Sequence, residues 1–212
     1  NKDKKIVPFK RGGLEVVSTG LITDDEDTAL MWRGLMLSKA LEQFLFDVEW
    51  GNLDYLVIDL PPGTGDIQMA LGRLLPQTDL VVVTTPQLSA QKVATRVADM
   101  AKRSFIPLLG VVENMSYFES GDGNKYNIFG KGGGDELSEK FGIPLLSKIP
   151  ISEDSIEESE NGTPILLQNN KTPTKEAMQD LVNTIIKVLP PVSDETCTGR
   201  LAKVLEELEV EA

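Results

Sequence analysis

The sequence predicts an α/β fold: a doubly wound, mostly parallel sheet with helices on both faces. Short, almost wholly apolar runs recur along the chain, as expected of strands buried on both faces of a parallel sheet. Between them lie segments whose apolar residues repeat with the helical period. Strands and helices that alternate in this way build a parallel sheet covered by helices.

Five segments are expected to be strands. They are residues 14–19, 55–60, 80–84, 108–112 and 145–149. Three segments show one apolar helical face each: Leu37, Leu41, Phe44, Leu45 and Val48; Ala90, Val93, Ala94, Val97 and Ala101; Ala177, Leu181, Ile185 and Val188. Two further helices are expected at about residues 65–75 and from near Asp135.

The chain is expected to hold one α/β domain over residues 1–189 and a tail over residues 190–212. Pro190 and Pro191 end the last core helix because proline cannot continue its hydrogen-bond ladder. The tail is a polar linker followed by a short acidic helix with a narrow apolar stripe, formed by Leu201, Val204, Leu205 and Leu208. That stripe either docks on its own domain or binds a partner.

Composition limits the classes of partner. The 212 residues are 41% hydrophobic and 25% charged, as in ordinary soluble domains, with a net charge of −12. This charge argues against nonspecific binding to nucleic acid or an anionic membrane, and no apolar run is long enough to span a bilayer. With one cysteine, Cys197, the chain cannot form an internal disulfide framework, which suits a reducing cytoplasm.

The segment from Tyr55 to Asp66 is the most informative motif. An apolar run ends at Asp59, and two prolines and two glycines follow at once. Open α/β sheets bind ligands at the carboxyl ends of their strands, and a carboxylate there followed by a mobile loop can reach Mg²⁺ on a nucleoside triphosphate. Alternatively, Asp59 caps the helix that follows.

With its neighbours, this motif resembles the Mrp (ApbC-like) branch of the MinD-like P-loop ATPases, whose members are iron-sulfur cluster carriers. The resemblance covers about residues 5–189. The matching pieces are WRG (32–34), WGNLDYLVIDLPPGTGD (50–66), VTTPQ (83–87), GVVENMSYF (110–118), IFGKGGG (128–134) and IPI (149–151).

The resemblance implies roles for residues around a bound ATP. Asp59 would hold Mg²⁺ through a water, and Asp66 would support the switch loop or a water network beside the phosphates. Pro61 and Gly63, with Pro62, would shape that loop. Asn114 would hydrogen-bond the adenine, with the backbone of Ile149, Pro150 and Ile151 beside it; its alternative role is a turn former at a strand end. Arg33 would lie near a dimer face or the switch, or simply pack at the surface.

Two motifs of the family are missing. No G-x-x-x-x-G-K-[ST] loop occurs, and in the family this loop lies upstream of the region that residues 1–10 resemble. The chain is therefore interpreted as the carboxyl-terminal part of a longer protein. The segment Gly130–Gly134 lacks the spacing and the lysine-hydroxyl pair of a phosphate loop, and is expected to free the backbone before a helix.

The second missing motif is C-x-x-C, the pair that would hold an iron-sulfur cluster between two subunits. In its place stands the cysteine-free stretch 119–127. Glu119, Asp122 and Asn124 could offer oxygens to a hard cation, but a hairpin turn around Gly121–Gly123 is the favoured interpretation.

The leading functional hypothesis is thus an ATP-hydrolysing iron-sulfur cluster carrier or assembly factor. It would act as a cytoplasmic homodimer, with iron-sulfur client or scaffold proteins as partners. The alternatives are a metal-free, nucleotide-gated scaffold or positioning protein of the MinD/ParA type, and an inactive fragment.

Overall fold

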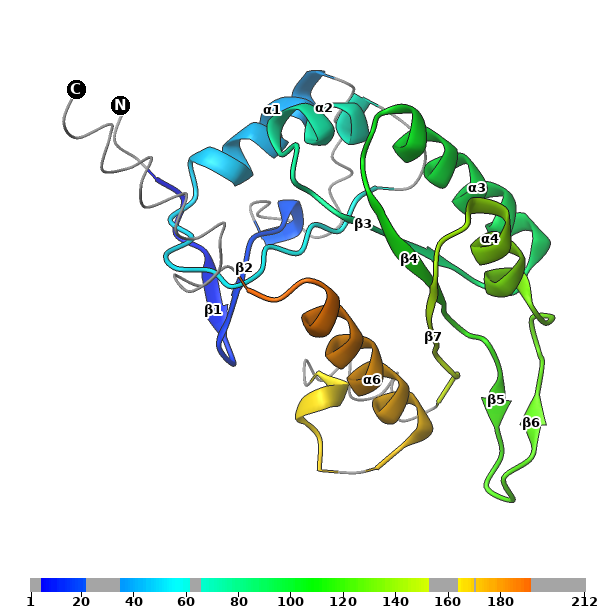
Figure 1. Cartoon of the computed structure of the whole chain (residues 1–212). Helices are drawn as coiled ribbons and strands as arrows, with labels where there is room; N and C mark the ends of the chain where they lie inside the picture. The colour runs from blue at the N-terminus through cyan, green and yellow to red at the C-terminus, as the bar shows by residue number, and fades with distance from the viewer. Residues whose placement is uncertain (1–4, 22–34, 62–65, 153–163, 170, 192–212) are drawn as a thin grey trace.

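A parallel sheet forms the centre of the molecule. The computed structural model describes residues 5–21, 35–61, 66–152, 164–169 and 171–191 (Figure 1). Strands β3 (Leu80–Thr84), β4 (Leu108–Glu113) and β7 (Leu145–Lys148) pair in the order β3-β4-β7, and both pairings are parallel. The predictions for these three strands are confirmed.

Close packing of β4 depends on Gly110. A Cβ atom at this position would lie 2.6 Å from both the Leu146 Cγ atom and the Pro144 carbonyl oxygen. Contacts this short are not tolerated, so the strand can approach the β7 segment only where a side chain is missing.

Helices α3 (Leu88–Arg103) and α4 (Gly133–Phe141) cover one face of the sheet. The core between these helices and the sheet is formed by Val82, Ala94, Ala98, Val111 and Leu137. Small alanines on α3 let the helix lie close to the strands, and Leu137 fills the space beside them. The apolar period predicted for residues 90–101 is confirmed in part: Ala94 and Ala101 are buried, Val93 is exposed, and the buried Ala98 was not in the predicted stripe.

Helix α6 (Pro173–Val188) packs against β7 from the opposite side, where the Ser147 hydroxyl donates to the Ala177 carbonyl oxygen at 3.2 Å. Thr172 caps the amino terminus of the helix, because its side chain accepts a hydrogen bond from the Lys175 backbone N–H. Pro173 occupies the first helical position. The sheet thus carries helices on both faces, as the sequence predicts.

The strand expected over residues 55–60 is absent, which corrects the sequence analysis. This segment is irregular, and Val57 is 89% exposed. Ile58 and Leu60 still pack on α1 (Leu35–Phe46) and α2 (Asp66–Leu74), in a small core around Leu41, Ile67 and Leu71. The side chains of this segment still alternate between the small core and solvent, but no strand in the described part of the chain pairs with it. A segment is a β-strand only when it is hydrogen-bonded to a neighbouring strand.

The expected strand over residues 14–19 is shorter and lies elsewhere than in the main sheet. β2 (Leu14–Val16) pairs with β1 (Phe9–Arg11) in an antiparallel hairpin, and a 3₁₀ turn, η1, follows at Thr19–Leu21. Gly12 and Gly13 make the reversal with φ values of 58° and 82°, a region that favours glycine. The residue pattern of a three-residue strand is too short to tell whether the strand belongs to a hairpin or to the main sheet.

A second hairpin extends from the carboxyl end of β4. β5 (Phe118–Glu119) and β6 (Lys125–Tyr126) are antiparallel, and Phe118 also bridges to Ile151 beyond β7. The hairpin predicted around residues 121–123 is confirmed. A 3₁₀ turn, η2 (Ile165–Leu167), precedes α6, and the acidic helix expected in the tail lies outside the described residues. Among the described helices, none is long and apolar enough to cross a bilayer.

Candidate functional site

The three parallel strands end together at one edge of the sheet, and backbone hydrogen bonds continue past their last residues. The Asn114 N–H donates to the Thr84 carbonyl oxygen at 2.8 Å, and the Ile149 N–H donates to the Glu113 carbonyl oxygen at 2.8 Å. The Ser116 N–H donates to the Ile149 carbonyl oxygen at 2.9 Å. Asn114 and Ile149, far apart in sequence, therefore lie in one hydrogen-bonded edge, as ligand sites of open α/β sheets require.

The Asn114 side chain is held in a way that leaves its amide donor available. Its Oδ1 atom accepts from the Met115 N–H at 2.9 Å, and Met115 adopts a φ of 54°. Within the described part of the chain, Nδ2 makes no hydrogen bond. The local turn thus uses one end of the carboxamide and leaves the other to bind a ligand.

The Ile149–Ile151 segment is fixed at both ends. Ile149 and Pro150 are buried, and the Pro150 carbonyl oxygen accepts from the Thr174 hydroxyl at 3.1 Å. The Ile151 N–H donates to the Tyr117 carbonyl oxygen at 2.8 Å. A hollow of about 370 Å³ lies beside this segment, between the base of the hairpin and the start of α6. Its lining includes Phe118, Pro150 and Thr172.

One buried polar atom at this edge lacks a partner. The Thr85 hydroxyl oxygen is shielded from solvent and makes no hydrogen bond within the described residues. Thr85 directly follows Thr84, to which Asn114 is bonded. Because an unpaired buried hydroxyl costs free energy, it marks a place where a polar group from outside these residues would be stabilising.

Glycines bring α4 against the strand ends. Gly132 caps the helix with a φ of 83°, and Gly130 has a φ of 99°. A Cβ atom on Gly133 would lie 2.3 Å from the Gln91 Nε2 atom and 3.0 Å from the Pro86 Cα atom. The glycine run therefore frees the backbone before a helix, as predicted, with α4 beginning at Gly133.

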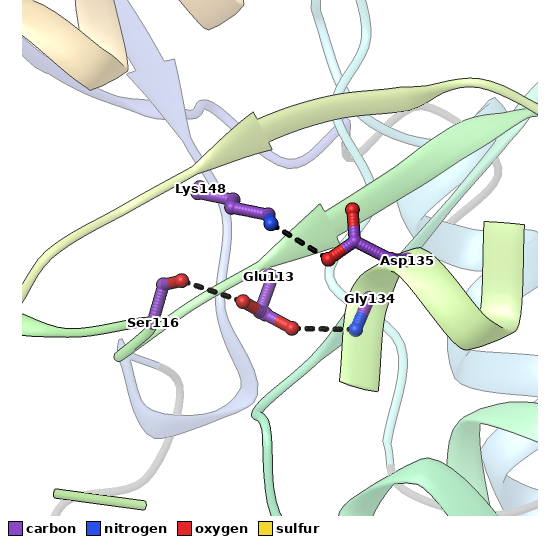
Figure 2. A network of polar contacts seen from close by, with 5 residues as sticks. All are labelled: Glu113, Ser116, Gly134, Asp135 and Lys148. Atoms are coloured by element: carbon purple, nitrogen blue, oxygen red, sulfur yellow. Dashed lines mark hydrogen bonds and ion pairs between the residues drawn. The ribbon is translucent and has the colours of Figure 1, made fainter. Parts of the chain in front are cut away.

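Glu113 was missed by sequence reasoning. It is 1% exposed, although it is charged, and its carboxylate accepts from the Ser116 hydroxyl and the Gly134 N–H, each at 2.5 Å (Figure 2). The sequence did hold one sign of a buried carboxyl group: Glu113 is the last residue of the otherwise apolar β4, where a buried side chain is expected.

The carboxylate predicted to hold Mg²⁺ lies apart from these contacts. Asp59 is exposed and makes no hydrogen bond or ion pair within the described chain. After it, the Pro61 carbonyl oxygen accepts from the Gln68 Nε2 atom at 3.3 Å, which ties the start of the loop to α2. Gly63 lies outside the described residues, and Asp66 begins α2 with its side chain undescribed.

The hairpin tip is closed by its own side chains. Asp122 accepts from the Ser120 hydroxyl, from the Asn124 N–H at 3.2 Å and from the Asn124 Nδ2 atom at 2.6 Å. These bonds, that of Ser120 first, lower the pKa of the Asp122 carboxyl. The Lys125 ammonium lies 4.3 Å from the Tyr117 ring centroid, and Tyr117, with a smaller effect of Glu119, raises the Lys125 pKa.

These hairpin residues do not match the ligands of an iron-sulfur cluster. The tip offers carboxylate, amide and hydroxyl oxygens but no thiolate, and thiolates are the usual ligands. Across the residues that the structure describes, no three His, Cys, Asp or Glu side chains gather in a way that could hold a metal ion.

Comparisons with known proteins identify the family of the chain. The family model of the ParA class described as "NUBPL iron-transfer P-loop NTPase" matches residues 1–186. The chain belongs to this family. Its α/β sheet is accordingly that of a P-loop NTPase, although the chain spans about half the length of the curated relatives it matches.

Those relatives include two proteins named iron-sulfur cluster carrier protein. The one from Aquifex aeolicus is 42% identical over 187 residues, which are 88% of this chain and 51% of that protein. The one from Bacillus subtilis is 39% identical over 183 residues, 86% of this chain and 51% of that protein.

Two solved structures share the fold. A nucleotide-binding protein from Archaeoglobus fulgidus, in complex with ADP, is 34% identical with a TM-score of 0.61, over 76% of this chain and 62% of the other. The septum site-determining protein MinD from Pyrococcus horikoshii, complexed with Mg-ADP, is 19% identical with a TM-score of 0.51 over 73% of this chain and 57% of its own, a likeness of fold alone.

Proposed function

We propose that this chain supplies the base-binding edge and the Mg²⁺-directed carboxylate of an ATP-hydrolysing iron-sulfur cluster carrier or assembly factor. The observation that carries the proposal is the edge itself, where Asn114 and Ile149–Ile151 are joined by backbone hydrogen bonds at the ends of three parallel strands. Membership of an iron-transfer NTPase family supports the same assignment.

The edge suits an adenine base. The Asn114 Nδ2 atom can donate to a ring nitrogen, while the Ile149–Ile151 backbone provides a fixed polar wall with Pro150 as an apolar surface. Because this segment is bonded to both α6 and the hairpin, it needs little reordering when a ligand binds. The unpaired Thr85 hydroxyl provides one more group for a polar ligand at the same edge.

Asp59 fits the other role, that of directing Mg²⁺. Its exposed carboxylate is a hard oxygen donor with no competing cation among the described residues. Mg²⁺, when bound, neutralises charge on the transferring phosphoryl group, and Asp59 would orient it through a water. Pro61 and Gly63 would shape the adjoining loop, and Asp66 would support it at the start of α2.

In the reaction, phosphoryl transfer to water requires mainly positioning and charge neutralisation, so these residues need not form a covalent intermediate. We assign ATP binding to closure of two copies of the protein and hydrolysis to their opening, with transfer of a cluster or a client protein. The site of action would be the cytoplasm, and iron-sulfur client or scaffold proteins would be the partners.

A second candidate is a nucleotide-gated scaffold or positioning protein that carries no metal. The observation that favours it is the closed, thiolate-free tip of the β5–β6 hairpin. In the first function, the cluster would need ligands from outside the described residues or from a partner.

The experiment is a steady-state ATPase assay on the full product of the gene, in wild-type form and as Asp59→Asn and Asn114→Ala. Asp59→Asn should lower kcat strongly at an unchanged melting temperature, because the amide lacks the charge that directs Mg²⁺. Asn114→Ala should raise KM for ATP more than it lowers kcat.

Asp99→Asn is the matched control, because Asp99 is an exposed aspartate on α3 whose contact is an ion pair with Arg103. Its kinetic constants should equal those of wild type. Unchanged turnover in Asp59→Asn, or loss of turnover in Asp99→Asn to the same degree, contradicts the assigned role. Iron and sulfide analysis of the same preparations separates the carrier from the metal-free scaffold.

A further inference from the structure

Glu113 occupies a position that the proposed mechanism does not use. It is the most deeply buried carboxylate among the described residues, yet no cation pairs with it there. Each oxygen instead accepts one donor, from Ser116 and from the Gly134 backbone (Figure 2). A buried carboxyl group costs free energy unless fixed hydrogen-bond donors replace its hydration.

The two donors come from different elements, Ser116 from the turn after Asn114 and Gly134 from α4. Ser116 closes the turn that begins at Asn114 and passes through Met115 in a left-handed conformation, which costs free energy for a side chain without special local bonding. Gly134 belongs to the first turn of α4, where a carboxylate is also favoured by the helix dipole. Glu113 therefore joins the turn to the helix.

The first turn of α4 has no room for a side chain at position 134. A Cβ atom on Gly134 would lie 2.8 Å from the Glu113 Cβ atom and 2.9 Å from the Leu145 Cδ1 atom. The helix start is thus pressed directly against the glutamate, and the backbone N–H reaches the carboxylate without an intervening side chain.

The same strand end also fixes Asn114 on its other side. The Glu113 carbonyl oxygen accepts from Ile149, and the Asn114 N–H donates to Thr84. The Glu113 side chain thus binds Ser116 and its backbone binds Ile149, so that one residue contacts both parts of the proposed base-binding edge.

We infer that Glu113 is a positioning residue for base selectivity: its buried carboxylate sets the Asn114 turn against Ile149–Ile151 without touching the ligand. This inference rests on the proposed function, because it assigns Glu113 to the same base-binding edge. Loss of the carboxylate should weaken recognition of the base while leaving binding of the phosphate chain unchanged.

The test compares ATP, GTP and inorganic tripolyphosphate as ligands of the full product of the gene, by calorimetry or competition. Glu113→Gln keeps the shape but turns an amide N–H toward one of the two donors. We expect ATP affinity and the preference of ATP over GTP each to fall about tenfold, the effect of one lost hydrogen bond to a charged group. Tripolyphosphate affinity should stay at the wild-type value.

Two further variants keep the test decisive if Glu113→Gln folds poorly. Ser116→Ala removes the donor on the turn and should reduce the same preference, whereas Ser116→Thr retains the hydroxyl and should restore it. Lys148→Ala is the matched control: it breaks the 2.7 Å ion pair to Asp135, which anchors the same first turn of α4 from β7 (Figure 2). Its ATP/GTP preference should equal that of wild type.

The outcomes separate this inference from the function on which it rests. If wild type binds no nucleotide, the proposed function fails and this inference fails with it. If wild type prefers ATP and the Glu113 and Ser116 variants keep that preference, only the positioning role is overturned. A loss of preference in Lys148→Ala equal to that in Ser116→Ala also overturns it, since the effect would then be general anchoring of α4.

Discussion

At the scale of single residues, the candidate edge site contains residues in environments that are unusual for their types. Glu113 is a carboxyl group buried from solvent, and Met115 is a non-glycine residue with a positive φ. Gly110 lies inside a strand at a position with no room for a side chain. All three lie on β4 or in the turn that ends it. The edge site is therefore built where the strand departs from regular structure.

Gly110→Ala should destabilise the fold. The added methyl would meet the Pro144 carbonyl oxygen at 2.6 Å, and a backbone atom cannot move aside as a flexible side chain can. The expected loss in free energy of unfolding is about 1–3 kcal/mol, as for other overpacked cores. Urea denaturation followed by circular dichroism measures it.

Gly121→Ala is the matched control for that substitution. Nothing lies within 4 Å of a Cβ atom at this position in the hairpin tip. Its midpoint should stay within experimental error of wild type. Equal midpoints for both variants would show that β4 and the Pro144–Leu146 segment move apart at little cost.

At the scale of elements, the three central strands and the helices α1, α3 and α6 could be predicted from apolar runs and periodicity, although Val48 of the first stripe lies beyond the end of α1. The 80–84 run is β3 residue for residue, and α6 carries the predicted 177–188 stripe. Residues 55–60 show the same pattern but form no strand, since hydrogen bonding to a neighbour is a property of the sheet and not of the segment. The β1–β2 hairpin was missed because its strands are three residues long and largely exposed.

The arrangement of the candidate site was predictable in part: Asn114 and Ile149 lie at one edge, whereas Asp59 makes none of its contacts and Gly63 lies outside the described residues. Asn114, Ile149 and Pro150 are placed together because strand ends of a parallel sheet share an edge. Glu113 and Ser116 could not be found in this way, since their bond depends on the turn through Met115 and on the approach of α4. Both are tertiary facts that no local pattern encodes.

The hairpin tip should respond to acid. Hydrogen bonds from Ser120 and Asn124 favour the charged carboxylate of Asp122, so its pKa in the folded tip lies below the ordinary value. The stabilisation of the tip is therefore present above the ordinary pKa and is lost as pH falls through the lowered one. NMR titration of the Asn124 amide protons should show a transition at that lowered pKa.

Asp122→Ala tests the same point without changing pH. It should remove the low-pH transition and broaden or shift the Asn124 amide signals at neutral pH, because the tip loses its acceptor. Signals of β3 residues should stay in place. A neutral-pH spectrum of the variant that matches wild type at Asn124 would mean that the turn forms without this carboxylate.

At the scale of the whole molecule, the sequence contains the proposed base-binding edge but no phosphate-binding loop motif. The sequence contains no G-x-x-x-x-G-K-[ST], and within the described residues β3 pairs with β4 alone. Val83 on β3 is 60% exposed and Val57 is 89% exposed, so apolar surface that a P-loop NTPase buries is open here. Among the described residues, one edge of β3 is thus unpaired and apolar side chains are exposed.

This arrangement predicts that the 212-residue chain alone binds ATP weakly. In P-loop proteins the phosphate chain contributes most of the binding through backbone N–H groups and a lysine. In this chain alone, only the proposed base contacts at Asn114 and Ile149–Ile151 would remain. We expect a dissociation constant on the order of 1 mM, similar for ATP and AMP, because neither the β- nor the γ-phosphate would be contacted. Calorimetry and amide shift mapping on the isolated chain measure the affinity and locate the contacts. A dissociation constant in the low micromolar range for ATP, or shifts absent from the Asn114 turn, would overturn this account of the edge.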